Sequence, residues 1–381
     1  MGKRIAIATL QGRNYGGRLQ NYALLQAIKK VAEEDCTVES LWFSKGKNPL
    51  YPNLLSRTKQ YSLREIFGKW FSMRSEKKHQ KEIDELLKGR FDLFDTFIAE
   101  HLLRTRWQTK TDRKNWGNVF DVIVCGSDQI WNPNIIDDVY TGTGTGIKKR
   151  VSYAASIGRG YISEYEAAYM VPRINEMDYV SVREESAKNI LKEAGVTKDI
   201  EVVVDPTLLL DQNEWNPIVA KRIIDEPYVF VYSFSDCKFK KQIMEKYHKR
   251  GIRVVFIPFA ERVWNKYDVN SPMEPLYDVG PSEFLSLVKY ADVVFTDSFH
   301  GMVFSIIFNK PFYVYERNKG GKTSMNSRIY DLLSAFNLKN RMLTDNLPNV
   351  DLCVDYGITN RRLDVMRRDS LLWLEKAIGA S

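Results

Sequence analysis

A histidine and two small polar residues separate two apolar runs in the segment TDSFHGMVFSIIFNKP, residues 296–311. The pattern predicts a strand that ends before Asp297 and an apolar helix that His300 and Gly301 open. At a helix N-terminus, free backbone N–H groups stabilise an anion, and a histidine there can donate to a phosphate or move a proton. Ser298, His300 and Gly301 are therefore candidates for contact with an anionic substrate. Simple capping by Asp297 or Ser298, with His300 on the surface, accounts for the same residues.

An arginine follows the strand expected at Tyr179–Val182, in the sequence YVSVREES. Arg183 would lie at the carboxyl end of that strand, which is the edge where α/β folds bind ligands. Its guanidinium is a planar fork of donors that suits a carboxylate or a phosphate. An ion pair with Glu184 or Glu185 is the structural alternative, and it stays open.

Polar side chains beside an indole follow a third apolar run, VIVCGSDQIWNP, residues 122–133. The strand would end at Gly126, and Asp128, Gln129 and Trp131 come soon after it. Hydrogen bonds from such side chains, together with stacking on an indole, can hold a sugar. Asp128 can also serve as a base for a sugar hydroxyl. A hydrogen-bonded network in a buried turn explains the same residues.

A loop with glycines joins the first expected strand to the first expected helix in TLQGRNYGGRLQNYALLQA, residues 9–27. Arg13, Asn14, Gly16 and Gly17 are candidates because glycine lets the backbone approach a ligand closely and arginine can pair with an anion. The spacing is neither GxGxxG nor a Walker loop. A tight turn from strand to helix accounts for it equally well.

Two further positions have a local interpretation. Arg328, in SMNSRIYDLL, stands near the start of an expected helix and would face His300 across a cleft; a surface arginine is the alternative. Asp205-Pro206 is interpreted as a hinge or turn rather than as part of a catalytic site.

The elements that must position these residues follow an α/β pattern, in which short β-rich runs alternate with amphipathic segments. The first set of expected strands is Lys3–Thr9, Thr37–Trp42, Val119–Cys125, Val151–Ala154, Tyr179–Val182 and Glu201–Val204. The second set is Tyr228–Phe234, Arg253–Pro258, Val293–Thr296 and Phe312–Tyr315. This order predicts two parallel sheets that face each other across a cleft, with ligands beyond the carboxyl ends of the strands.

The length of 381 residues fits two domains. We expect an N-terminal α/β domain over residues 1–212, a C-terminal α/β domain over residues 226–360 and a final basic helix over residues 361–381. Residues 50–116 are helical, basic and aromatic without clear strands, so we expect them to form an insertion in the first domain. Residues 260–280 are expected to be a loop.

The composition restricts the class of protein. No run approaches the ~20 apolar residues that a membrane span requires, and the first residues predict a strand rather than a signal peptide, so a cytoplasmic location is expected. The four cysteines are far apart without a CxxC pair, which favours free thiols and gives no zinc framework. No zinc-finger, RNP or helix-turn-helix signature indicates a nucleic-acid partner.

Much of the net charge of +8 falls between Arg57 and Lys88. A solvated helix face explains this run, and so does a patch for anionic lipid or for a lipid-diphosphate acceptor. The last helix is basic as well, so peripheral association with the inner face of the membrane is a further expectation.

Taken together, GSDQIWNP, SVREES, VVDPTLLL and DSFHGMVFSIIFNKPFY, with NYGGRLQNYAL near the start, resemble the polysaccharide pyruvyl transferase family. The resemblance runs from residue 4 to about residue 336 in the family's order. It implies two Rossmann-like domains in a glycosyltransferase-B-like arrangement, phosphoenolpyruvate as donor substrate without a further cofactor, and an acceptor sugar that receives a pyruvate ketal. His300 matches the family's motif histidine, and Arg183 matches an arginine implicated in donor binding.

The chemistry of the donor and the acceptor suggests roles for the candidates. The donor is expected to contact Arg183, Ser298, His300, Gly301 and Arg328. The acceptor, a lipid-linked or nucleotide-linked sugar, is expected at Arg13, Asn14, Gly16, Gly17, Gln129 and Trp131. His300 is assigned to phosphate contact or acid catalysis, and Asp128 to the acceptor hydroxyl. The sequence shows no cluster of metal ligands, so no metal is expected.

One position departs from the family. Many members have Arg-Leu-His where this chain has Ser298-Phe299-His300, so the arginine two residues before the histidine is missing. Arg328 is the expected substitute.

Two other functions stay open. A nucleotide-sugar glycosyltransferase would need an acidic contact to a ribose, for which Glu283 or Glu316 is available. The second is a non-catalytic glycan-binding protein that retained the fold, which would explain why the family's arginine is missing.

Overall fold

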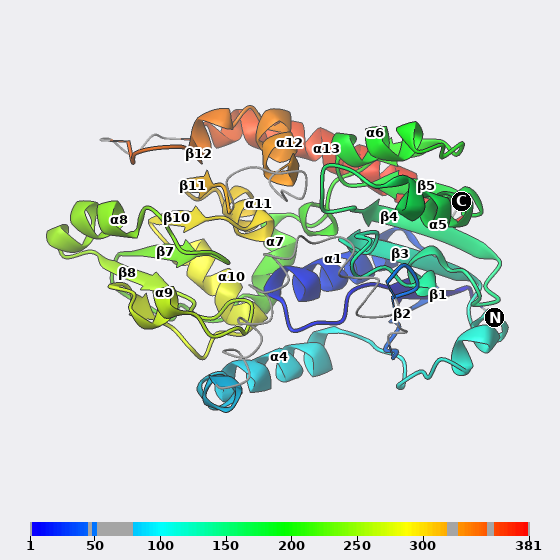
Figure 1. The fold of residues 1–381 in the computed structure, drawn as a ribbon, viewed down its shortest axis with the longest axis horizontal. Coiled ribbons are helices and arrows are strands. Elements are labelled where there is room, and N and C mark those ends of the chain that lie inside the picture. Colours follow the sequence, from blue (N-terminus) through cyan, green and yellow to red (C-terminus); the bar gives the residue numbers. More distant parts are fainter. Residues whose placement is uncertain (1, 45–47, 52–78, 318–326, 349–353, 380–381) are drawn as a thin grey trace.

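The first of two β-sheets gathers six parallel strands in the order β2-β1-β3-β4-β5-β6 (Figure 1). The computed structural model describes residues 2–44, 48–51, 79–317, 327–348 and 354–379. The strands of this sheet are β1 (Arg4–Ala8), β2 (Thr37–Ser40), β3 (Val122–Asp128), β4 (Lys149–Ala155), β5 (Tyr179–Val182) and β6 (Ile200–Val202). A parallel sheet is buried on both faces, which is why β3 begins with the continuous apolar run VIVC.

The second sheet has the strand order β12-β11-β10-β7-β8-β9, and its neighbouring strands are also parallel. Its strands are β7 (Tyr228–Tyr232), β8 (Arg253–Phe256), β9 (Glu274–Pro275), β10 (Val293–Thr296), β11 (Phe312–Tyr315) and β12 (Met342–Leu343). The predicted α/β class with two Rossmann-like domains in a glycosyltransferase-B-like arrangement is therefore confirmed. The expected domain limits at residues 212 and 226 remain predictions.

Helices connect the strands of both sheets. In the first half they are α1 (Tyr15–Val31), α4 (Lys88–His101), α5 (Glu164–Asn175), α6 (Glu185–Glu193) and α7 (Gln212–Trp215). In the second half they are α8 (Lys240–Lys246), α9 (Lys266–Val269), α10 (Pro281–Tyr290), α11 (Phe299–Ile307) and α12 (Ser327–Ala335), and the chain ends with α13 (Tyr356–Ile378).

The prediction of a loop over residues 260–280 is wrong in part. This segment contains α9 and β9, and β9 pairs with β8 through Val255 and Glu274. A strand of two exposed residues shows no apolar alternation, so its sequence carries no signal that a pattern search can detect.

The last helix, α13, returns to the first sheet, as Figure 1 shows for the red ribbon beside β4 and β5. The Ser370 hydroxyl accepts a hydrogen bond from the Val204 N–H at 3.1 Å, and Lys3 Nζ donates to the Ile378 carbonyl at 3.3 Å. Ile378 is fully buried. The chain therefore crosses between the halves a second time, and α13 closes one side of their junction.

Within the expected helical insertion, α4 contacts the second half of the chain. Residues 52–78 of it lie outside the described residues, and α4 forms a helix as predicted. The buried Arg90 on α4 donates to backbone carbonyls of the second half: Nε to Tyr277 at 2.9 Å and Nη1 to Pro258 at 3.0 Å. Each of these bonds to a charged donor helps to hold α4 against the second sheet.

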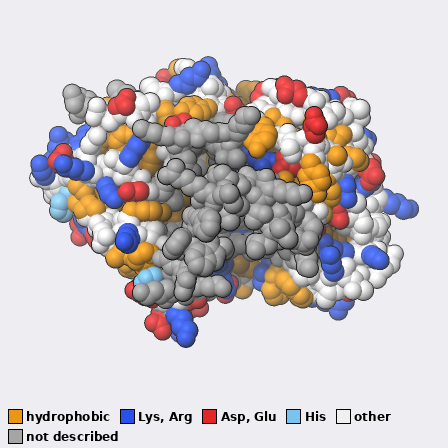
Figure 2. All heavy atoms as spheres, in the orientation of Figure 1, with side chains coloured by type: hydrophobic (Ala, Val, Ile, Leu, Met, Phe, Trp, Pro, Cys, Tyr) orange, Lys and Arg blue, Asp and Glu red, His pale blue; other side chains and the backbone are white. Residues whose placement is uncertain are grey.

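The described surface carries mixed charge, with a basic area at the end of the second half. Figure 2 shows Lys and Arg side chains gathered at the left, where α8 lies in Figure 1. Lys238, Lys241, Lys249 and Arg250 are exposed there. Most of the basic run between Arg57 and Lys88 lies outside the described residues. No described helix has the length and apolar character that crossing a membrane requires.

Candidate active site

His300 lies in the first turn of α11, directly beyond the carboxyl end of β10, and is 7% exposed. Ser298 caps this helix, since its hydroxyl accepts a hydrogen bond from the Gly301 N–H at 3.3 Å. The Met302 N–H donates to the Ser298 carbonyl at 3.1 Å. The cap therefore uses the Gly301 amide that was expected to contact a donor substrate. His300 itself is buried, which contradicts the alternative of a surface histidine.

The imidazole of His300 packs against the first turn of α1, which belongs to the other half of the chain. A Cβ on Gly16 would overlap the imidazole ring, beginning at Nδ1. Asn14 caps α1 by accepting a hydrogen bond from the Gly17 N–H at 3.1 Å. The close approach of the two halves therefore requires glycine at position 16. The expected loop at Asn14–Gly17 and the expected histidine meet in the structure.

A buried carboxylate, Asp205, stands between His300 and Arg183. Its Oδ2 lies 2.7 Å from Arg183 Nη1 and 3.7 Å from His300 Nε2, the second distance being too long for a hydrogen bond. Its Oδ1 accepts from the Thr207 N–H at 3.0 Å and from the Thr207 hydroxyl at 2.6 Å. Burial raises the pKa of Asp205, but the neighbouring His300, Arg183 and Thr207 together hold that pKa well below its usual range.

The interpretation of Asp205 as a turn residue missed this role. Asp205 does cap the short helical turn Pro206–Leu208, and the sequence Asp-Pro-Thr signals that cap. Its contacts with Arg183 and His300 come from distant parts of the chain, so no local pattern could reveal them.

Arg183 follows β5 as predicted, and its side chain is 2% exposed. Its Nε pairs with Glu184 Oε1 at 3.1 Å, and its Cζ lies 4.3 Å from the centre of the Phe299 ring. Burial lowers the pKa of Arg183, but Glu184 and Asp205 more than reverse this effect, so the guanidinium stays charged. The structural ion pair considered for this arginine is therefore present. Its Nη2 still has no hydrogen-bond partner in the described part of the chain.

Arg328 is buried near the start of α12, which contradicts the alternative of a surface arginine. Its Cζ lies 5.8 Å from the centre of the Phe299 ring. The Gln129 amide oxygen faces the guanidinium of Arg328, because a guanidinium can only donate hydrogen bonds. Nη1 and Nη2 both donate to this oxygen at 3.2 Å. Burial and the nearby Arg183 lower the pKa of Arg328 to about 10.

Three buried nitrogen atoms of this region lack hydrogen-bond partners within the described residues: His300 Nε2, Arg183 Nη2 and Arg328 Nε. Leaving a buried donor unpaired costs about 1–3 kcal/mol, and more when the group is charged. Such groups therefore indicate a missing partner, and the two guanidinium groups among them favour an anion as that partner.

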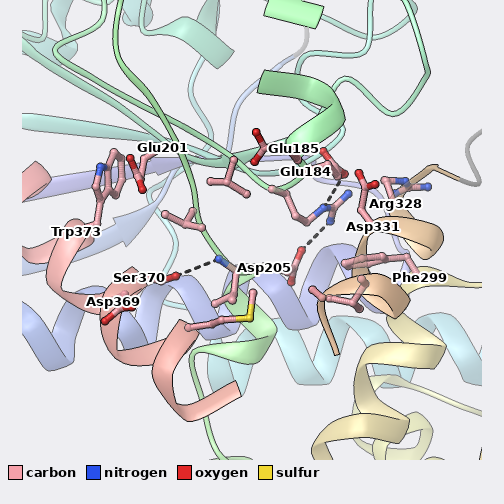
Figure 3. Close-up of a pocket in the computed structure, with 17 residues that line it drawn as sticks. Glu184, Glu185, Glu201, Asp205, Phe299, Arg328, Asp331, Asp369, Ser370 and Trp373 are labelled. Atoms are coloured by element: carbon pink, nitrogen blue, oxygen red, sulfur yellow. Dashed lines mark hydrogen bonds and ion pairs between the residues drawn. The ribbon is translucent and has the colours of Figure 1, made fainter. Parts of the chain in front are cut away.

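A cavity of about 470 Å³ borders the two arginines (Figure 3). Arg183, Asp205, Phe299 and Arg328 form part of its wall, and residues 184–185, residues 201–204, α12 and α13 contribute further lining residues. His300 is not part of this wall, but Asp205 lies in the wall and faces it. The two arginines therefore border the cavity directly, whereas His300 is separated from it by the side chain of Asp205.

Asp128, the expected base, lies at the end of β3 and is half-buried. Its backbone has φ of 67°, in the left-handed region, which is uncommon for a residue other than glycine and frequent at functional sites. Its Oδ1 accepts from the Gln129 N–H at 2.9 Å, and a Cβ on Gly17 would lie 3.9 Å from its Oδ2. Asp128 thus sits beside the start of α1 and next to the Gln129 that faces Arg328.

Two expected acceptor contacts are engaged elsewhere. Trp131 is 0% exposed and donates from Nε1 to the Tyr140 carbonyl at 3.0 Å, so its ring has no free face for stacking on a sugar. Arg13 pairs with Asp95 on α4 at 2.6 Å and lies over the Phe91 ring at 5.0 Å.

The acidic residues considered for a ribose contact also have structural partners. Glu283 accepts from the Gly280 N–H at 3.0 Å and so caps α10. Glu316 accepts from the Tyr330 hydroxyl at 2.9 Å.

Within the ranges that the structure describes, a grouping with the spacing of metal ligands occurs at Glu33, Asp35 and Cys36, after α1. It includes no residue of the site. At the site itself, the carboxylates of Glu184 and Asp205 pair with Arg183.

A family model described as polysaccharide pyruvyl transferase matches residues 14–319, more than half of the chain. No curated protein matches the sequence. Three solved structures are similar over most of their length. UDP-GlcNAc 2-epimerase from Neisseria meningitidis has 10% identity and a TM-score of 0.46, covering 98% of this chain and 100% of that one. UDP-GlcNAc 2-epimerase from Methanocaldococcus jannaschii has 14% identity and a TM-score of 0.45, covering 96% and 92%. ADP-heptose lps heptosyltransferase II from E. coli has 10% identity and a TM-score of 0.38, covering 96% and 99%.

Proposed function

Because the chain belongs to the polysaccharide pyruvyl transferase family, we propose that it transfers pyruvate from phosphoenolpyruvate to a sugar of a surface polysaccharide precursor, forming a ketal. The observation that carries this proposal is the set of unpaired buried donors on His300, Arg183 and Arg328. Phosphoenolpyruvate has a carboxylate and a nearly doubly charged phosphate, so one small molecule could supply acceptors for all three.

The proposed reaction joins two hydroxyl groups of one sugar to the central carbon of phosphoenolpyruvate. A proton adds to the methylene carbon, and the first hydroxyl oxygen bonds to the central carbon as its proton passes to a base. The second hydroxyl oxygen then displaces the phosphate, which leaves with the second proton. The products are one ketal and one inorganic phosphate, and no oxidation or reduction takes place.

The residues of the site have distinct tasks in this proposal. His300 contacts the phosphate or supplies the proton, and Asp128 receives the proton of the sugar hydroxyl. Arg183 and Arg328 balance the charge of the donor. Asp205 contacts no substrate in this proposal, and it positions Arg183 and His300.

Arg328 takes the place of the arginine that many family members have two residues before the histidine. In this chain that position is Ser298, which is buried and occupied as a helix cap. Arg328 approaches from α12 instead, and Phe299 lies close to both its guanidinium and that of Arg183. A ring face beside two cations supports their packing together.

The acceptor is proposed to be a lipid-linked or nucleotide-linked sugar. A lipid-linked acceptor would bring the protein to the inner face of the membrane. The exposed Lys238, Lys241 and Lys249 near α8 would suit such an anionic surface.

Thermal unfolding with added ligands tests the donor. Phosphoenolpyruvate should raise the melting temperature of the wild type, because a ligand that binds only the folded state stabilises it. The rise should be absent in His300→Ala and should persist in Arg262→Ala, which changes an exposed arginine outside the site. Stabilisation by UDP-GlcNAc without a response to phosphoenolpyruvate would instead favour a glycosyltransferase.

Release of phosphate tests the reaction. Incubation with phosphoenolpyruvate and a panel of glycosides should release inorganic phosphate in amounts that depend on the glycoside. Binding of phosphoenolpyruvate without any such release, across glycosides that carry lipid or nucleotide groups, would favour a non-catalytic glycan-binding protein.

A further inference from the structure

The cavity beside Arg183 and Arg328 has two chemically different ends (Figure 3). At one end lie the guanidinium groups of Arg183 and Arg328. At the other end Figure 3 shows Trp373 and Glu201, on the far side of Asp205 from Arg328. A ligand that fills the cavity therefore meets two guanidinium groups with Glu184 and Asp331 at one end, and Glu201 with an indole at the other.

Among the described residues of the wall, carboxylates exceed cations. They include two arginines and six acidic residues, namely Glu184, Glu185, Glu201, Asp205, Asp331 and Asp369. Arg183 occupies Glu184 and Asp205. Glu185, Glu201 and Asp369 are exposed, and Asp369 pairs with Arg368 at 3.3 Å. Asp331 accepts a hydrogen bond from the Ser186 hydroxyl at 2.9 Å.

An ionised carboxylate can only accept hydrogen bonds, so this end of the cavity suits a ligand rich in O–H donors. A second anion there would meet the like charge of Glu201. An anionic donor substrate is therefore expected at the arginine end of the cavity, and a ligand with hydroxyl groups at the end near Glu201.

The floor of the cavity is apolar and includes a partly exposed indole. Val202, Val204, Leu332 and Met366 line it, next to Trp373. The Trp373 ring lies 6.3 Å from the Tyr179 ring in an edge-on contact, which holds the indole in place. A sugar ring presents an apolar C–H face and an edge of hydroxyls, and it matches a floor of this kind surrounded by carboxylates.

We infer that this cavity binds the ring of the acceptor sugar, with its C–H face on Trp373 and its hydroxyls on Glu201 and Asp369. The inference rests on the proposed function and adds to it the place of the second substrate. A volume of about 470 Å³ lies within the range of small-molecule sites. The other hydroxyls of the ring, which include the two that react, are then left for the arginine end, where Arg328 lies next to Gln129. Trp373 thus takes the stacking role that the sequence suggested for the buried Trp131.

Saturation-transfer NMR on the full chain tests this site. The probes are methyl β-D-galactopyranoside, methyl β-D-mannopyranoside, methyl β-D-glucopyranoside and glucosamine, each measured with phosphoenolpyruvate present. At least one neutral glycoside should bind, and Trp373→Ala should weaken its binding about tenfold, as loss of a ring contact predicts. Glu201→Gln and Asp369→Asn change exposed side chains, leave the fold intact, and should each weaken binding about threefold. Trp107→Ala, which removes a tryptophan that is 47% exposed and outside the cavity wall, should have no effect.

Several results would overturn the inference. These are binding of a glycoside that none of the three cavity variants weakens, binding of glucosamine alone, and no binding of any neutral glycoside. The melting-temperature response to phosphoenolpyruvate separates this failure from failure of the proposed function. If phosphoenolpyruvate still raises the melting temperature of Glu201→Gln, but the cavity variants leave sugar binding unchanged, only the acceptor site is wrong. If phosphoenolpyruvate does not raise the melting temperature of the wild type, the proposed function is wrong.

Discussion

The imidazole of His300 faces the carboxylate of Asp205 across the junction of the two sheets, with Nε2 3.7 Å from Oδ2. Asp205 follows β6 of the first sheet, and His300 follows β10 of the second. The same carboxylate holds Arg183 at 2.7 Å. One buried anion therefore sets the position of two groups that we propose to act on the same donor substrate.

Asp205 should make the stability of the fold depend on pH. Its pKa is lower in the folded protein than the value of about 3.9 expected in the unfolded chain, so the folded state binds fewer protons. The resulting stability is present above about pH 4 and is lost as the pH falls toward the folded pKa. We expect the free energy of unfolding, measured with urea, to fall less steeply below about pH 4 in Asp205→Asn than in the wild type. Glu176→Gln, which removes an exposed partner of Arg150, should keep the wild-type slope, and parallel curves for Asp205→Asn and wild type would contradict this prediction.

Gly16→Ala should impair catalysis through His300. The added Cβ would overlap the imidazole and displace it, and a misplacement of about 1 Å can cost on the order of 100-fold in rate. Steady-state release of phosphate should therefore show a large loss of kcat. Gly12→Ala is the matched control in the same loop, because a Cβ there meets no atom within 4 Å. Equal activity of the two variants would show that the contact between Gly16 and His300 is unimportant.

Arg183→Met should lower both activity and stability. The substitution leaves the carboxylates of Glu184 and Asp205 buried without their cation, and breaking a buried pair in this way costs about 3–5 kcal/mol. Arg253→Met removes exposed ion pairs with Glu226 and Glu274 and should cost no more than about 1 kcal/mol. Urea unfolding of the two variants tests the difference, and a stable Arg183→Met protein would show that the ion pairs contribute little.

Arg328→Ala should act on the donor rather than on the fold. Arg328 makes no ion pair with a carboxylate in the described residues, so its removal leaves no buried anion behind. We expect the KM for phosphoenolpyruvate to rise about tenfold or more, with a smaller rise in Gln129→Ala, which removes only the oxygen that orients the guanidinium. An unchanged KM in Arg328→Ala would mean that another cation replaces the arginine missing before His300.

Local sequence patterns were sufficient for the fold class and for part of the site. Apolar runs and the polar residues after them predicted β3, β5 and β10 together with Arg183 and His300 at their carboxyl ends. These features repeat over a few neighbouring residues, because strand and helix periods and helix caps are properties of adjacent side chains.

Only the tertiary structure reveals the contacts and the burial of each of these residues. The sequence identifies Asp205 only as a turn residue, because its contacts with Arg183 and His300 form when distant strands pack together. The sequence suggests that Trp131 stacks on a sugar, but the structure shows that its ring is buried. The return of α13 to the first sheet places Trp373 beside a cavity that no stretch of sequence defines. Burial and charge pairing depend on contacts between distant segments, and those contacts exist only once both sheets have formed and packed.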